Sequence, residues 1–172
     1  MSRPVAYIGA DPGMGGALAV LVLDPLRGLG QLSVEDMPAL EVNGKRQMDM
    51  WSLAHILMQW VHSFDVRNSA VERVHAMPKQ GVTSAFSFGF SAGALQQAIA
   101  SAGLPLTLIQ PATWKAIYGL RGGRENKDMS RRKASEMFPS FAHLWARKKD
   151  EGRAEAVLLA HYASRLQEGA AK

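Results

Sequence analysis

The chain has 172 residues, of which 47% are hydrophobic and 20% are charged. This composition is typical of a globular protein and excludes a disordered tail, a fibre or a coiled-coil rod. There is no cysteine, which excludes disulfides, thiolate zinc sites and cysteine nucleophiles. Lys and Arg total 20 against 15 Asp and Glu, so the net charge is +5 and the isoelectric point about 9.7. This balance favours a polyanionic partner.

The length predicts a single domain over residues 1–172. No targeting segment is recognisable, because the first apolar run, Val5–Ile8, is short and leads into a Gly-rich turn. The longest apolar run, Ala17–Leu23, is far below the roughly 20 residues that cross a bilayer. We therefore expect a protein of the cytoplasm or of an organelle interior, with no membrane partner.

Short apolar runs separated by Gly and Pro predict three strands in an antiparallel meander: Val5–Ile8, Ala17–Leu23 and Gln31–Met37. Asn43-Gly44 follows them as a turn pair or a polar loop. Helical and strand-like patterns then alternate. They predict a helix over Met50–Ser63, a strand over Ser69–Val74, a helix over Ser84–Ala102, a strand over Leu104–Ile109, a short helix over Pro111–Tyr118, a polar loop over 119–126, and helices over Lys127–Met137 and Glu151–Gln167. This order indicates an α/β fold with a mixed sheet.

Acidic residues stand where carboxylates are costly. Asp11 ends the first predicted strand and Glu72 lies within the fourth, so each needs a partner or a metal ion. A third acidic group, Asp150, Glu151 and Glu155, flanks the start of the last helix, where Glu151 and Glu155 share a helical face. If the first and fourth strands are neighbours, Asp11 and Glu72 lie side by side. Clustered carboxylates without His or Cys select Mg²⁺ or Mn²⁺.

Each acid also has a simpler explanation. Asp11 stands in an Asp-Pro-Gly sequence and can be a turn former. Glu72 can be half of a salt bridge with Arg73 or Arg153. The acids of the last helix can complement the positive end of its dipole.

Positive charge is concentrated between residues 111 and 149, where ten Lys and Arg residues oppose three acids. The segment carries +7, whereas the rest of the chain carries −2. A basic segment beside an acidic cluster suits a metal-dependent nuclease, since cations hold phosphates while carboxylates hold the metal ions. A solvated helical face is the alternative for residues 131–133. The predicted DNA-binding residues are Lys79, Phe86, Lys115, Arg121, Arg124, Arg131, Arg132, Lys148 and Lys149.

Two further features are less specific. Phe86, Phe88 and Phe90 can pack in the core or act as a wedge that stacks on an unpaired base. The turn over residues 9–16 lacks the Gly-Lys-Ser/Thr ending of a P-loop. Acidic Gly-rich turns between strands also occur in sugar kinases and actin-like ATPases, which are normally much longer.

Segments along nearly the whole chain resemble the RuvC-type Holliday-junction resolvases of the ribonuclease-H-like superfamily, and most closely the chloroplast and phage-type branch. The segments that carry the resemblance are Ile8–Gly13, Gly16–Val20, Val71–Glu72, Phe88–Leu95, Pro111–Lys115, Lys127–Arg131, Ala134–Pro139 and Lys148–Ala156. The last of these combined with the first is specific, whereas the first alone is not. The resemblance implies a five-stranded mixed sheet, three strands antiparallel and two parallel, with helices on both faces.

The resemblance also implies catalytic, metal-binding roles for Asp11, Glu72 and Glu155. Many bacterial RuvC proteins carry a further aspartate three residues before the last of these acids, where this chain has Gly152. The Lys-Lys-Asp pattern of the branch assigns the fourth position to Asp150, with Glu151 in reserve.

The implied activity is the symmetric nicking of four-way DNA junctions by a homodimer, with two Mg²⁺ ions per site that Mn²⁺ can replace. The resemblance also implies that Lys127 neutralises the scissile phosphate. A non-catalytic junction-binding protein of the same fold is the alternative, and Gly152 supports it. The Asp-Pro-Gly turn alone suggests a small phosphotransferase of the actin-like kind. Flaps or RNA–DNA hybrids are substrate variants of the nuclease.

Overall fold

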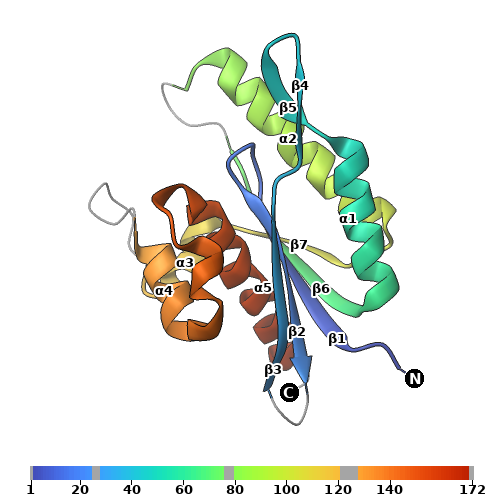
Figure 1. Ribbon diagram of the computed structural model, residues 1–172, viewed down its shortest axis with the longest axis vertical. Coiled ribbons are helices and arrows are strands. Elements are labelled where there is room, and N and C mark those ends of the chain that lie inside the picture. The colour runs from blue at the N-terminus through green and yellow to red at the C-terminus, as the bar shows by residue number, and fades with distance from the viewer. Residues whose placement is uncertain (1, 25–27, 76–79, 121–127, 171–172) are drawn as a thin grey trace.

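Five strands form one mixed sheet in the computed structural model, which describes residues 2–24, 28–75, 80–120 and 128–170 (Figure 1). The strands of this sheet are β1 (Val5–Asp11), β2 (Ala17–Asp24), β3 (Gly28–Asp36), β6 (Asp65–Glu72) and β7 (Leu106–Ile109). Their order is β3-β2-β1-β6-β7. The first three are antiparallel, while β6 runs parallel to β1 and β7 parallel to β6. The predicted fold class is therefore confirmed.

Helices cover both faces of this sheet (Figure 1). The pair α1 (Met50–Ser63) and α2 (Val82–Ser101) packs on one face. The opposite face carries α3 (Pro111–Ile117), α4 (Met129–Met137), the 3₁₀ segments Pro139–Trp145 and Lys148–Asp150, and α5 (Glu151–Ala170). Side chains alternate along a strand, so Leu18 and Val20 of β2 join the first layer while Ala19 and Leu21 join the second.

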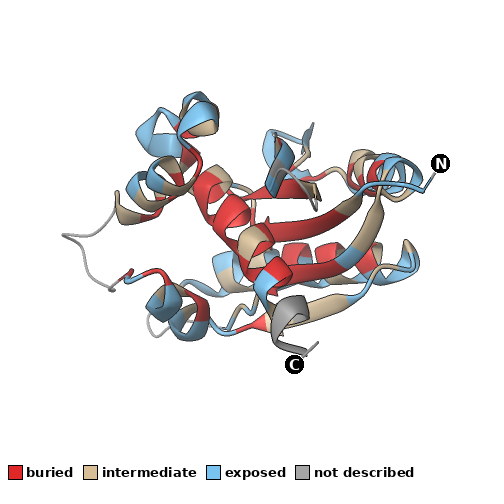
Figure 2. Ribbon diagram, turned by 90° about the horizontal axis from the view of Figure 1, so that it is seen from below, coloured by how far each residue is buried: buried red, intermediate tan, exposed pale blue. Residues whose placement is uncertain are grey.

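The central part of α5 is buried on all sides, because the sheet lies beneath it and α4 with the 3₁₀ segment covers it (Figure 2). It approaches β1 most closely at Gly9. A Cβ atom at this position would lie 2.0 Å from the carbonyl oxygen of Ala156 and 2.1 Å from the amide nitrogen of Ala160. The absence of a side chain at Gly9 therefore sets the depth at which α5 lies on the sheet.

A second, two-stranded sheet was not among the predicted elements. It is the hairpin of β4 (Ala39–Val42) and β5 (Lys45–Met48). The turn residues Asn43 and Gly44 have φ angles of 51° and 71°, which fits the type I′ turn that Asn-Gly favours in a two-residue hairpin. The turn interpretation of Asn43-Gly44 is confirmed. Its flanking strands were missed because each is only four residues long and β5 begins with the polar run Lys-Arg-Gln.

The other predicted elements are present with shifted ends. The fourth predicted strand begins at Asp65 instead of Ser69 and ends at Glu72. Most of the predicted loop over 119–126 lies outside the described residues, as does Lys127. No helix in the described ranges is long and apolar enough to cross a membrane.

Gly9→Ala should destabilise the protein by about 3 kcal/mol or more, because backbone atoms of α5 leave no room for a methyl group. Thermal or denaturant unfolding measures the loss. Gly93→Ala is the matched control: its Cβ meets nothing within 4 Å, so it should stabilise α2 by about 0.5–1 kcal/mol. Equal effects of the two substitutions would contradict this account of how α5 packs.

Candidate metal centre and active site

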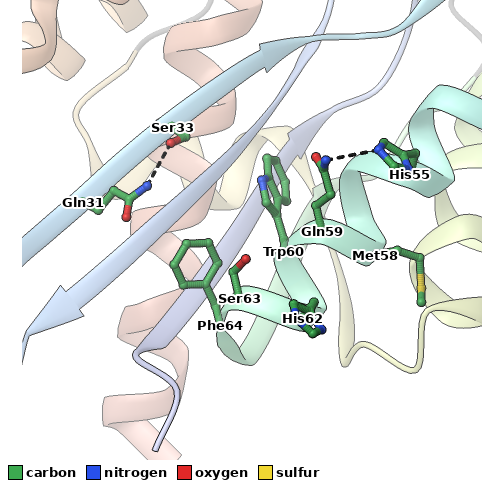
Figure 3. A pocket seen from close by; sticks show the side chains of 9 residues that line it. All are labelled: Gln31, Ser33, His55, Met58, Gln59, Trp60, His62, Ser63 and Phe64. Atoms are coloured by element: carbon green, nitrogen blue, oxygen red, sulfur yellow. Dashed lines mark hydrogen bonds between the residues drawn. The ribbon is translucent and has the colours of Figure 1, made fainter. Parts of the chain in front are cut away.

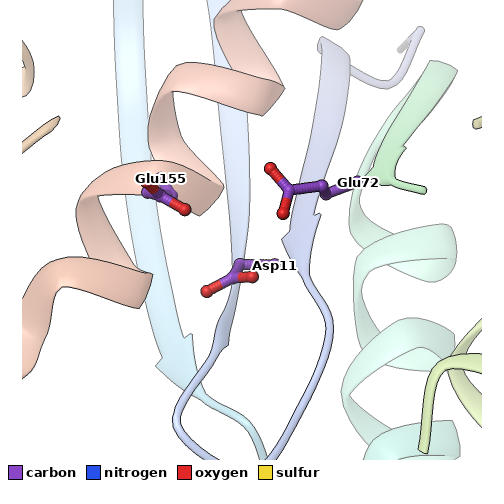
Figure 4. Close-up of side chains that lie close together, drawn as sticks. All are labelled: Asp11, Glu72 and Glu155. Carbon is purple, nitrogen blue, oxygen red and sulfur yellow. The ribbon is translucent and has the colours of Figure 1, made fainter. Parts of the chain in front are cut away.

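Three acidic side chains from three elements converge at one edge of the main sheet (Figure 4). Asp11 ends β1, Glu72 ends β6 and Glu155 lies on α5, and each offers a carboxylate oxygen within 4.8 Å of the others. The parallel register pairs the residues just before the first two, Ala10 with Val71. Parallel neighbours therefore bring the two strand-end carboxylates together, as the sequence predicts.

The proximity of these carboxylates has an electrostatic cost. Burial raises the pKa of Asp11 well above its ordinary value of 3.8, and the charges of Glu155 and Glu72 raise it further. Burial also raises the pKa of Glu72, although Lys115 and Trp114 oppose the shift. Without a cation, the three groups resist full ionisation. Three carboxylates gathered in this way can hold a divalent metal ion.

Two neighbouring residues of α3 complete the cluster. Lys115 places its Nζ 3.0 Å from a carboxylate oxygen of Glu155 and 3.8 Å from one of Glu72. Burial lowers the pKa of Lys115, but the two glutamates outweigh burial and raise it. Trp114 is fully buried, and its indole N–H donates to Glu72 over 2.8 Å. Lys115 was predicted only as a DNA contact, so its place among the acids was missed.

The order of the elements along the chain already indicated that Lys115 lies near the acids. Helix α3 begins at Pro111, two residues after β7 ends, and β7 is the parallel neighbour of β6. The first turns of α3 therefore start at the same sheet edge as the two strand-end acids. Ser130 of α4 was missed as well: its hydroxyl donates to Glu155 over 2.9 Å and holds that carboxylate in place.

The salt-bridge explanation of Glu72 does not describe its contacts, whereas Asp11 does stand directly before a turn. Asp11 pairs with Ala17 across β1 and β2, and the turn that follows it is closed by Gly16, whose amide donates to the carbonyl of Gly13. Glu72 contacts neither of the two arginines considered, because in the described structure its partners are Trp114 and Lys115. Arg153 instead pairs with Asp36.

Asp150 lies outside the group of three. Its buried carboxylate accepts hydrogen bonds from the backbone N–H of Arg147 at 2.9 Å and from the guanidinium of the same residue at 2.8–3.1 Å. These hydrogen bonds lower the pKa of Asp150. Its visible role is to cap the 3₁₀ segment that leads into α5.

At Gly152 a side chain would force neighbouring atoms to shift. A Cβ at this position would lie 2.6 Å from the carbonyl oxygen of Gly15 and 3.0 Å from Oδ2 of Asp11. The start of α5 thus packs directly on the turn between β1 and β2. Glu151, one helical turn before Glu155, is close enough for its charge to raise the pKa of Asp11.

The predicted DNA contacts are distributed unevenly. Lys79, Arg121 and Arg124 lie outside the described residues, whereas Phe86, Arg132, Lys148 and Lys149 are exposed. The guanidinium of Arg131 binds Asp128 and the backbone carbonyls of Trp145 and Ala146. It is therefore used within the protein.

A cavity of about 530 Å³ lies away from the acids, between edge strand β3 and α1 (Figure 3). Its lining includes His55, Trp60 and His62 but neither a carboxylate nor a Lys or Arg side chain. This cavity therefore lacks the carboxylates that bind Mg²⁺ and the cationic side chains that pair with phosphate.

No family model matches the sequence, and no curated protein is significantly similar to it. Among solved structures, that of T. thermophilus RuvC in complex with a Holliday junction substrate superposes with a TM-score of 0.58 at 20% identity. A Thermus thermophilus RuvC structure superposes with a TM-score of 0.55 at 19% identity. Each comparison covers 95% of this chain and 96% of the other. This chain has the fold of RuvC. The predicted ribonuclease-H-like fold is confirmed, while placement in the chloroplast and phage-type branch stays a prediction.

Asp11→Asn should raise metal-free stability at pH 7 and abolish stabilisation by Mg²⁺. Because the pKa of Asp11 is raised in the folded protein, this residue contributes its full stability only below about pH 3.8, the pKa of an ordinary aspartate. That contribution is lost as the pH rises through the folded-state pKa, and a neutral amide removes the cost. Thermal unfolding measures both effects. Mg²⁺ at 100 times its Kd should stabilise the wild type by about 2.7 kcal/mol.

Asp65→Asn is the control, because Asp65 stands at the opposite end of β6 and pairs with Arg67. It should keep the Mg²⁺ response. An equal response in Asp11→Asn would contradict a metal site at the acidic cluster.

Asp150→Ala should lose about 1–2 kcal/mol of stability, the usual effect of removing a helix cap, and should keep its response to Mg²⁺. Glu151→Gln should weaken that response without a comparable loss of stability. Titration of the melting temperature with Mg²⁺ separates the two effects. Loss of the Mg²⁺ response in Asp150→Ala would instead make Asp150 the fourth ligand, as the resemblance implies.

Proposed function

We propose that this protein is a divalent-metal-dependent endonuclease that resolves four-way DNA junctions by symmetric nicking. The observation that carries the proposal is the convergence of Asp11, Glu72 and Glu155 at the sheet edge, in a chain that shares its fold with RuvC. RuvC has been solved in complex with a Holliday junction substrate. The basic segment supplies the charge that such a polyanionic substrate requires.

The donor set fits Mg²⁺, with Mn²⁺ as a substitute, because its oxygens are hard carboxylate ligands. Asp11, Glu72 and Glu155 would hold two such ions together with a fourth acid, for which the contacts of Asp150 favour Glu151. Bound there, the ions would lower the pKa of an attacking water and stabilise the departing 3′ oxygen.

The surrounding residues orient and balance these ligands. Trp114 and Ser130 donate hydrogen bonds to Glu72 and Glu155, which fixes the direction of each carboxylate. Lys115 supplies a positive charge beside both glutamates, and we propose that it turns to the scissile phosphate when DNA binds. We propose the same electrostatic role for Lys127.

Outside the acidic cluster, exposed cations before α5 and on α4 would bind the arms of the junction. Lys148 and Lys149 precede α5, and Arg132 projects from α4. Phe86 would contact bases at the branch point. We further propose a homodimer, because two sites related by symmetry can nick two opposed strands of a four-way junction.

The wild type should cut a labelled immobile four-way junction at paired symmetric positions in Mg²⁺ and should not cut it in EDTA. Asp11→Asn should lose cleavage and still bind the junction, because it loses a metal ligand and keeps the basic surface. A linear duplex of the same sequence is the substrate control, and Asp65→Asn is the protein control.

Junction binding without cleavage in either Mg²⁺ or Mn²⁺ would favour the non-catalytic junction-binding alternative. Cleavage that persists in Asp11→Asn would place the active site elsewhere. If the wild type neither binds nor cuts the junction, the proposed substrate is wrong.

A further inference from the structure

The β4–β5 hairpin projects from the main sheet and lies beside the N-terminal half of α2 (Figure 1). A cavity of about 320 Å³ separates the two elements. Its lining includes Lys45 and Arg46 from β5, Phe86 and Phe90 from α2, and Met14 from the turn after β1. The hairpin thus forms one wall of a groove whose other wall is aromatic.

This groove adjoins a second cavity at the start of α5. The second cavity, of about 290 Å³, shares Met14 and Arg46 with the first. It is lined further by Gly16 and by Lys149 and Arg147, beside the start of α5. The turn between β1 and β2, which follows Asp11 and lines this cavity, also packs against Gly152. The two adjoining cavities therefore form a track from the turn after Asp11 and the start of α5 to the exposed rings on α2.

The track is positively charged. The two carboxylates that line its second cavity are both neutralised, since Asp36 pairs with Arg153 and Asp150 with Arg147. In the ranges that the structure describes, none of the other three cations on the track forms an ion pair: Lys45, Arg46 and Lys149.

Glu41 is the cross-strand neighbour of Arg46, and among the described residues it forms no ion pair with that arginine either. The cations of the hairpin remain available to a ligand.

The hairpin has almost no hydrophobic core of its own. Residues 39–47 are exposed, and only Met48 is buried. A hydrogen bond from the Asp49 amide to the Pro38 carbonyl closes the base of the hairpin, and the type I′ turn closes its tip. Because residues 39–47 are exposed, hydrophobic burial does not account for the two strands of the hairpin. Isolated two-stranded hairpins are marginal in water.

We propose that the β4–β5 hairpin is a nucleic-acid-binding element whose Lys45 and Arg46 contact the phosphate backbone of the strand that leaves the acidic cluster. The inference rests on the proposed nuclease function and adds a binding surface that the basic segment between residues 111 and 149 does not include. Unpaired cations along a track that ends at exposed rings match a nucleic-acid strand, which carries phosphates and stackable bases. Phe86 and Phe90 are 75% and 53% exposed, so their faces are open to such bases.

The test compares the Lys45→Gln/Arg46→Gln double variant with the wild type in binding to a four-way junction at several KCl concentrations, with EDTA present to prevent cleavage. Each phosphate contact adds about one unit to the slope of log K against log salt. The double variant should bind more weakly at every salt concentration, with a slope shallower by about 2.

The control is the Arg67→Gln/Arg3→Gln double variant, which removes the same charge near the starts of β1 and β6, at the opposite end of these strands from the acidic cluster. Arg67 lies near the start of β6, and the guanidinium of Arg3 contacts the carbonyl of Val61. Its slope should equal that of the wild type. Melting temperature with and without Mg²⁺ should be unchanged in the hairpin variant, because Lys45 and Arg46 are exposed and lie outside the acidic cluster.

The outcomes separate this inference from the function on which it rests. If the wild type binds and cuts junctions while the hairpin variant has the slope of the control, the hairpin serves another partner and the inference is wrong. If the wild type does not bind junctions at all, the proposed function fails and the hairpin proposal fails with it. A selective loss of slope in the hairpin variant supports the inference even if no cleavage is detected.

Discussion

The repulsion among three carboxylates held within 4.8 Å of one another is the constraint on which the rest of this structure depends. Such a group is unfavourable unless positive charge is close. The chain supplies part of that charge with Lys115, which contacts both glutamates. The position of the Lys115 ammonium also indicates where a divalent ion would bind favourably, since both cations are attracted by the same excess of negative charge. The cost that the cluster imposes on metal-free folding is thus the source of its affinity for metal.

Backbone packing holds the group together against this repulsion. Asp11 and Glu72 are side by side because β1 and β6 pair in parallel, and Glu155 reaches them because α5 lies against Gly9 without an intervening side chain. The same close approach continues at Gly152, where α5 meets the turn after β1. Both glycines therefore serve the site: each lets a helix backbone come close enough to place an acid.

Most strands and helices were predictable from the sequence, because apolar periodicity is a local signal, and Asp11 and Glu72 stood out as acids in apolar strands. The place of Glu155 beside them was implied by the family resemblance. Three features were missed. The hairpin strands are four residues long and almost entirely exposed, so burial left no alternating pattern in them. Lys115 looked like one more surface cation, because its contact with Glu155 depends on tertiary packing. Asp150 had the spacing of a ligand, yet its pairing with Arg147 is visible only in three dimensions.

The most direct test of the central claim is a crystal structure of the protein grown with Mn²⁺, in which anomalous scattering locates the metal. The account predicts a peak bonded to carboxylate oxygens of Asp11, Glu72 and Glu155, at about 2.0–2.3 Å, with the Lys115 ammonium displaced from Glu155. A structure in which Lys115 still contacts Glu155 and manganese binds only at other residues would contradict the claim that this cluster is a metal centre.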